Sequence, residues 1–238
     1  MQFYKKTTIG LMLFLAITMS SCLNILEEIT FKKSGSGHYK MSIDMSQMKQ
    51  MMEMLKGMGG QDSTGTGAAE MGQLDQMGAA FTQLSDVLHG VRGLKNTMAI
   101  NDTTNFVFGY EFDFDDIDAL NRAVKKIGDQ GETKGGVPDA LFTFKKGKFE
   151  RLDASGGMVE DMKKAMIGGD ENMEQAKMMF ADMTATTIYN FPDQKVSKQN
   201  HSSGEISKDG HSIKIELKPF AEGADLKKMG SGIKAKIK

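Results

Sequence analysis

The ten residues Asn105–Phe114, NFVFGYEFDF, decide the fold of this chain. Their aromatic side chains recur at every second position, as in a strand that buries one face and exposes the other to water. The preceding segment Leu94–Asn101, joined through a short polar turn, is the expected partner strand. We therefore predict a hairpin with one strongly apolar face, formed by Phe106, Phe108, Tyr110, Phe112 and Phe114.

Further strands are predicted on both sides of this hairpin. One hairpin surrounds the SGSG sequence of Ser34–Gly37, and another surrounds Gly147. A β-branched segment, Thr184–Phe191, leads into a closing meander, in which Asp209-Gly210 is typical of a type I′ turn. The strands are expected at 25–33, 38–44, 140–144, 148–152, 184–191, 195–200, 204–208 and 211–218.

Apolar residues at helical spacing predict helices between these hairpins. The helices are expected at 47–56, 74–88, 120–127 and 158–183. Because short turns join neighbouring strands, the sheet should be antiparallel, and helices must cover its aromatic face. The predicted fold class is α+β, with an antiparallel sheet built from hairpins and amphipathic helices packed on one face.

The first 22 residues are typical of a bacterial lipoprotein export signal. Lys5 and Lys6 precede an apolar run, Thr7–Met19, which is shorter than the roughly 20 residues that span a bilayer. Small residues then precede Cys22, the expected site of lipidation. An ordinary signal peptide followed by a free thiol is the alternative. Because Leu23 rather than Asp follows the cysteine, the expected location is the outer membrane of the cell envelope, facing the periplasm or the exterior.

The predicted organisation is a signal peptide at 1–21, one α+β domain at 22–220 and a basic C-terminal tail at 221–238. A mobile Gly-rich loop is expected at 57–72. Without Lys5 and Lys6, the 30 basic residues fall by two against 31 acidic ones, so the mature chain is nearly neutral. No nucleic-acid partner is expected from this balance. The chain has one cysteine, so no disulfide is expected.

An acidic run, Asp113 to Asp118, supports two interpretations. Carboxylates are hard ligands for Ca²⁺ or Mg²⁺, but the Gly and Glu of an EF-hand loop are missing from their places. The alternative is that Asp115 or Asp116 caps the following helix, with the other acids complementing its dipole. The second interpretation is favoured, and no metal site is predicted.

Methionine is abundant, with 21 residues in the chain. Thioethers are soft ligands that select Cu(I), which makes metal handling an alternative function. Methionine also fills irregular cores and lines adaptable apolar grooves. We predict such an apolar binding surface, for a protein partner or an apolar ligand, at Met48, Met51, Met52 and Met58.

No motif of nucleophilic or zinc-dependent catalysis is present, so no catalytic residue is predicted and the protein is not expected to be an enzyme. No cofactor is expected apart from the lipid on Cys22. The expected function is that of a membrane-anchored, non-catalytic binding or structural module, with the membrane and an envelope protein as partners.

Two segments, EEITFKKSGSGHYKMSIDMSQM after the cysteine and TTIYNFPDQKVSKQN leading to SKDGHSIKIELKP, resemble uncharacterised bacterial lipoproteins of the Bacteroidota type. The same segments are similar to the LppM-like lipoprotein domain. The resemblance implies a membrane-tethered α+β domain without an established reaction. It assigns a role to Cys22 alone.

Overall fold

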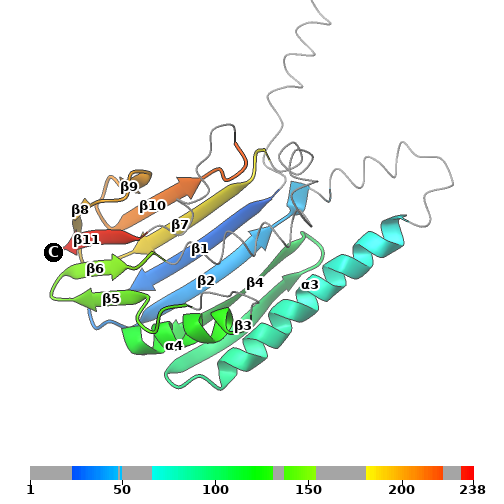
Figure 1. Ribbon diagram of the computed structural model, residues 1–238, viewed down its shortest axis with the longest axis horizontal. Helices are drawn as coiled ribbons and strands as arrows, with labels where there is room; N and C mark the ends of the chain where they lie inside the picture. The colour runs from blue at the N-terminus through cyan, green and yellow to red at the C-terminus, as the bar shows by residue number, and fades with distance from the viewer. Residues whose placement is uncertain (1–22, 48, 50–65, 131–136, 154–180, 222–231) are drawn as a thin grey trace, which may run out of the picture.

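The structure is a computed structural model that describes residues 23–47, 49, 66–130, 137–153, 181–221 and 232–238. Two β-sheets and two helices make up this part of the chain, which confirms the predicted α+β class. Figure 1 shows the larger sheet as a twisted plane, with the smaller sheet in front of one end.

The larger sheet has seven strands in the order β3-β4-β2-β1-β7-β10-β9. The predicted aromatic hairpin forms as β3 and β4, and β2 pairs with the other side of β4. The bounds of the strands are β1 Asn24–Phe31, β2 Gly37–Asp44, β3 Leu94–Asp102, β4 Val107–Phe114, β7 Thr184–Asn190, β9 Gly204–Ile206 and β10 Ser212–Leu217.

One pairing in this sheet differs from the prediction of a purely antiparallel arrangement. Strand β1 pairs with β7 in parallel, with Asn24 opposite Thr184 and Thr30 opposite Asn190. The prediction was wrong here because a hairpin pattern reports only strands that are adjacent in the sequence. Parallel pairing joins distant segments and leaves no turn signal.

A second sheet, not predicted as a separate layer, has four strands in the order β5-β6-β11-β8. Its strands are β5 Phe142–Lys145, β6 Lys148–Arg151, β8 Val196–Gln199 and β11 Ile233–Ile237. Strand β11 lies between β6 and β8, so the end of the predicted tail at 221–238 is an interior strand of the fold. Alternation of buried Ile233, Ala235 and Ile237 with lysines explains why this basic segment forms a strand.

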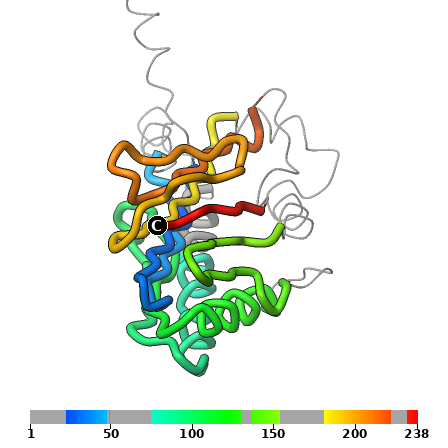
Figure 2. Tube along the Cα trace, turned by 90° about the vertical axis from the view of Figure 1, so that its left-hand side faces the viewer, coloured from blue at the N-terminus to red at the C-terminus, as the bar shows by residue number. Residues whose placement is uncertain are grey.

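Two helices cover the same face of the larger sheet as the second sheet (Figure 2). Helix α3, Thr66–His89, packs on β3 and β4, and α4, Ile117–Gly128, packs on β3, β4 and β5. Helix α3 begins eight residues before the predicted start at Leu74. Residues 66–72 are therefore helical rather than part of the predicted loop, while residues 57–65 lie outside the described part.

Aromatic side chains fill the space between the sheets. Phe31 lies at the centre of this core, with its ring centroid 5.0 Å from that of Phe149 and 5.7 Å from that of Phe191. At the other end of β1, a smaller buried cluster contains Leu23, Met45, Phe108, Met183 and Phe220. Phe106, predicted to belong to the strand, instead has a φ of 58° before β4 begins and packs against this smaller cluster.

Candidate functional site

An ionised pair lies inside the core, between the two sheets. The segment Ile25–Phe31 alternates regularly, and this places Glu27 on the same buried face as Ile29. Arg151 shares a face of β6 with the buried Phe149, two residues before it. The side chains of Arg151 and Glu27 are only 7% and 15% exposed.

The Glu27 carboxylate receives hydrogen bonds from three elements. Arg151 Nη1 donates to Glu27 Oε2 at 2.5 Å, and Thr187 Oγ1 donates to the same oxygen at 3.3 Å. The Tyr39 hydroxyl donates to Glu27 Oε1 at 3.0 Å. Arg151 Nη1 also donates to the Tyr189 hydroxyl at 2.9 Å. We call these five residues the inter-sheet polar cluster.

Tyr39, Tyr189 and Arg151 of this cluster hold fixed protonation states at neutral pH. Burial, reinforced by the negative charge of Glu27, raises the pKa of the Tyr39 hydroxyl well above its ordinary value. Burial also raises the pKa of Tyr189, to about 12. For Arg151, burial acts to lower the pKa, but the charge and hydrogen-bond contributions of Glu27 and Tyr189 together outweigh it, and the pKa is raised. The tyrosines therefore stay neutral and the guanidinium stays charged.

This arrangement connects the two sheets and is well suited to fix their spacing. A buried ion pair is sensitive to the removal of either partner, because the remaining charge is left without compensation. Arg151 also lies over the Phe142 ring, 5.3 Å from its centroid, which adds a cation–π contact. Its Nε is buried without a hydrogen-bond partner among the described residues. The cluster thus holds the charge of Arg151 in place between the two sheets.

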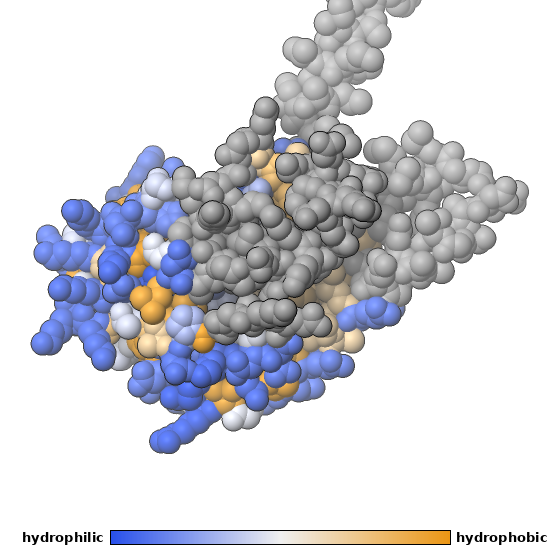
Figure 3. Space-filling view, in the orientation of Figure 1, coloured by the Kyte–Doolittle hydropathy of each residue, from blue (hydrophilic) through white to orange (hydrophobic). Residues whose placement is uncertain are grey.

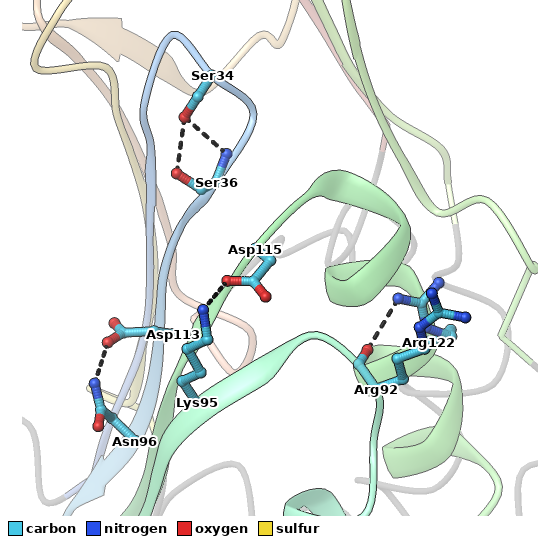
Figure 4. Close-up of polar contacts among 8 residues, drawn as sticks. All are labelled: Ser34, Ser36, Arg92, Lys95, Asn96, Asp113, Asp115 and Arg122. Carbon is cyan, nitrogen blue, oxygen red and sulfur yellow. Dashed lines mark hydrogen bonds and ion pairs between the residues drawn. The ribbon is translucent and has the colours of Figure 1, made fainter.

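The acidic run at Asp113 to Asp118 is distributed among several partners (Figure 4). Asp115 Oδ1 accepts a hydrogen bond from Lys95 Nζ at 2.7 Å, and Asp113 Oδ2 accepts one from Asn96 Nδ2 at 2.7 Å. Asp116 caps α4 by accepting the backbone N–H of Ala119 at 2.7 Å. The capping interpretation is confirmed for Asp116. Among the described residues, no group of three His, Cys, Asp or Glu side chains has a metal-binding arrangement.

A histidine and two carboxylates lie together on the outer face of the larger sheet. His38 Nδ1 is 2.8 Å from Asp113 Oδ1, and His38 Nε2 is 3.9 Å from Glu111 Oε2. The hydrogen bonds from Asn96 and His38 lower the pKa of Asp113. A histidine oriented by a carboxylate is one part of a nucleophilic triad. In the described part of the chain, no hydroxyl group is hydrogen bonded to this ring.

The residues predicted as functional sites lie outside the described part. These are Cys22, the expected lipidation site, and the four methionines of the expected apolar surface, Met48, Met51, Met52 and Met58. Their predicted roles stay predictions. Within the described residues, no helix has the length and apolar character that crossing a membrane requires.

The sequence analysis missed the inter-sheet polar cluster, although one signal was present. An acid at Glu27 in phase with Ile25, Ile29 and Phe31 interrupts an apolar face. Such a residue needs a buried partner, because an unpaired charge is costly in a core. The partner, Arg151, is 124 residues away, and no local pattern links the two positions.

Comparison with known proteins gives limited information. No family model matches the chain, and no curated protein matches it. Among solved structures, the chain is similar to the folded domain of the Mycobacterium tuberculosis LppM protein, with 10% identity and a TM-score of 0.40. The match covers 91% of this chain and 89% of that domain. The resemblance to uncharacterised lipoproteins of the Bacteroidota type stays a prediction.

Proposed function

We propose that this protein is a lipoprotein of the bacterial cell envelope, anchored through lipid on Cys22, whose α+β domain is a non-catalytic binding module. The observation that carries the proposal is the signal at 1–22, with its basic start, short apolar run and small residues before the cysteine. The outer membrane is the proposed location, because Leu23 rather than Asp follows the cysteine.

The start of the fold is consistent with cleavage before Cys22. Leu23 is buried, and its carbonyl oxygen accepts a hydrogen bond from Thr184 N at 3.2 Å. Strand β1 begins at the next residue, Asn24. Removal of residues 1–21 would therefore delete none of the described fold. It would leave the lipid directly beside the end of the sheet where β1 begins.

The contacts and burial of the inter-sheet polar cluster fit a structural role in the domain. Its tyrosines stay protonated and its guanidinium stays charged at neutral pH, so none of these groups is suited to act as a general base. We therefore assign the cluster to the architecture of the domain. Acyl chains supply ~0.8 kcal/mol per buried CH₂, so two or more of them give a durable attachment to the membrane.

The test compares the full chain with its Cys22→Ser variant, expressed in a bacterium with lipoprotein processing. We expect the wild-type protein to fractionate with the outer membrane and to show an acylated N-terminal Cys22 by mass spectrometry. The variant should lose the lipid and leave the membrane fraction under high salt. A native N-terminus elsewhere, or an unmodified thiol on Cys22, would overturn the proposal.

A further inference from the structure

The outer face of the four-stranded sheet is positively charged, although the chain as a whole is nearly neutral. Seven lysines, all with exposed side chains, lie on its strands and turns. We call this set the lysine strip; it consists of Lys145, Lys146, Lys148, Lys195, Lys198, Lys236 and Lys238.

Four members of the lysine strip form a continuous row across the sheet. Lys145 on β5 is opposite Lys148 on β6, and Lys148 is opposite Lys236 on β11. Lys236 in turn is opposite Lys198 on β8. Directly opposed residues in antiparallel strands point to the same face. The row therefore places one lysine on every strand of this sheet.

A second row lies beside the first. Lys195 and Lys238 exchange both backbone hydrogen bonds, at 2.9 and 2.8 Å, which makes them a directly opposed pair. Lys146 belongs to the adjoining β5–β6 turn, where the carbonyl of Gly147 accepts the N–H of Ile237 at 2.7 Å. Figure 3 shows hydrophilic side chains along the left-hand margin of the molecule, where Figure 1 places this sheet.

The charge of the strip is not neutralised within the described part of the chain. None of the seven lysines forms an ion pair with another described residue. The four strands contain one acidic residue, Glu150, and its Oε1 is bound by Lys234 Nζ at 2.9 Å. Like charges placed directly opposite one another destabilise a sheet. The opposed lysines therefore do not stabilise the isolated domain. An anionic partner that neutralises their charge accounts for their arrangement.

The surroundings of the strip indicate the class of partner. The large hydrophobic side chains exposed in the described part are Met98, Leu152 and Ile206; of these, only Leu152 adjoins a strand of this sheet, directly after β6 and four residues from Lys148. Protein interfaces have apolar and aromatic centres and are depleted in lysine. Single-stranded nucleic acids are bound by aromatic side chains that stack with the bases. A partner with a hydrophilic backbone and many negative charges needs neither feature.

The dimensions of the strip favour a chain over a small ion. The row of four lysines crosses three inter-strand spacings of about 4.8 Å, or roughly 14 Å in all. In the second row, Lys238 lies two residues beyond Lys236, about 7 Å away. This area is much larger than one phosphate or carboxylate group, so it can contact several such groups at once.

The position of the strip separates it from the proposed lipid anchor. The strip belongs to the sheet that packs on the Phe31 end of β1, where the Phe31 and Phe144 ring centroids are 5.9 Å apart. The eight residues of β1 lead from there back to Asn24, a rise of roughly 23 Å over seven residue steps. If Cys22 is lipidated, as proposed above, the strip lies far from the membrane surface around the anchor.

We infer that the lysine strip binds a hydrophilic anionic polymer other than a protein, one that carries phosphate or carboxylate groups along its chain. Each lysine acts as a point charge, so contact is electrostatic and tolerant of the detailed structure of the polymer. Binding must therefore weaken as salt concentration rises. The inference on binding is independent of the lipid on Cys22; only the orientation of the strip away from the membrane rests on it.

The test uses the mature protein in neutral detergent, with linear polyphosphate and polygalacturonate as probes. The variant is the double substitution Lys148→Gln and Lys236→Gln, in the middle of the row. We expect affinity for both polymers to fall about tenfold at low salt, and the slope of log affinity against log salt to become shallower by about two, one for each lysine removed. The matched control, Lys126→Gln with Lys214→Gln, removes the same charge from exposed positions elsewhere and should bind within about twofold of wild type.

Three outcomes would overturn the inference. The first is equal binding by the row variant and the control variant. The second is tight binding to vesicles of anionic phospholipid without binding to either polymer, which would identify a bilayer surface. The third is tighter binding to polyglutamate than to either polymer, which would identify an acidic protein. Because the substitutions remove like-charge repulsion, the row variant should unfold at a urea concentration no lower than wild type, so lost binding cannot be attributed to unfolding.

Discussion

Removing Arg151 should destabilise the domain far more than removing an exposed lysine of the same sheet. In an Arg151→Met variant, the Glu27 carboxylate keeps only the hydroxyls of Tyr39 and Thr187 as described donors. At 15% exposure the carboxylate cannot regain full hydration. Breaking a buried pair in this way costs about 3–5 kcal/mol of the free energy of unfolding. For a domain of this size, that lowers the Tm by roughly 6–20 °C.

The assay is urea unfolding followed by circular dichroism, on the chain from residue 22 with Cys22→Ser. Lys234→Met is the matched control, because Lys234 lies opposite Glu150 next to the Arg151 pair in the same ladder. The lysine side chain is 68% exposed, so its loss should cost less than about 1 kcal/mol.

A double variant tests the coupling between the two charges. Adding Glu27→Gln to Arg151→Met removes the unpaired charge and keeps an acceptor for the Tyr39 hydroxyl. We expect it to recover roughly half of the lost stability. With Glu27→Gln measured alone to complete the cycle, the coupling is then at least about 2 kcal/mol. If Arg151→Met costs no more than Lys234→Met, or if the two substitutions are simply additive, the cluster does not connect the sheets as described.

Three further predictions follow from other parts of the structure. An Asp116→Ala variant loses the cap of α4 and should be less stable by about 1 kcal/mol in urea unfolding, whereas an Asp118→Ala variant in the first turn should lose less. Deletion of residues 233–238 removes β11 with its buried Ile233 and Ile237, and about 3–6 kcal/mol of stabilisation from apolar burial is lost. This loss is comparable with the whole free energy of unfolding of a domain, so near-UV circular dichroism should show that fixed side-chain packing is lost. Burial raises the folded-state pKa of Tyr39, Tyr110 and Tyr189 above the ordinary value of 10.0, so their contribution to stability is present below pH 10 and is lost as the pH rises towards 12. Tyrosinate absorbance should therefore appear only when the protein unfolds. Titration of these tyrosines near pH 10 in the folded protein would contradict this prediction.

Local patterns in the sequence predicted the local parts of the fold well. The strict alternation around Tyr110 placed β4 to within two residues, because a two-residue period is a direct consequence of burying one face. The hairpins β1–β2 and β9–β10 were found from turn residues, whereas β8, predicted to belong to the same closing meander, pairs with β11 in the other sheet. The cap of α4 at Asp116 was one of two expected positions, and backbone geometry chose between them.

Features that depend on distant residues could not be predicted in the same way. The parallel pairing of β1 with β7 and the insertion of β11 between β6 and β8 have no signature within either segment. The basic residues of β11 masked its buried positions, since Ile233, Ala235 and Ile237 were read as part of a simple lysine-rich tail. Likewise, the net charge of the chain does not show where lysines lie close together in the fold, because the four lysines that oppose one another across the small sheet come from four different strands.

The pairing of β1 with β7 also has a consequence for how the domain forms. Strand β1, in the middle of the larger sheet, pairs with a strand 160 positions further along the chain, as the hydrogen bond between Thr184 and Asn24 shows. Its pairing is therefore complete only after β7 has been synthesised. Closing so long a loop costs entropy before any contact repays it, and chains dominated by such contacts fold slowly. Until β7 arrives, one edge of β1 is an open template for aggregation. We therefore expect a chain of this topology to need protection by a holding chaperone between synthesis and final assembly.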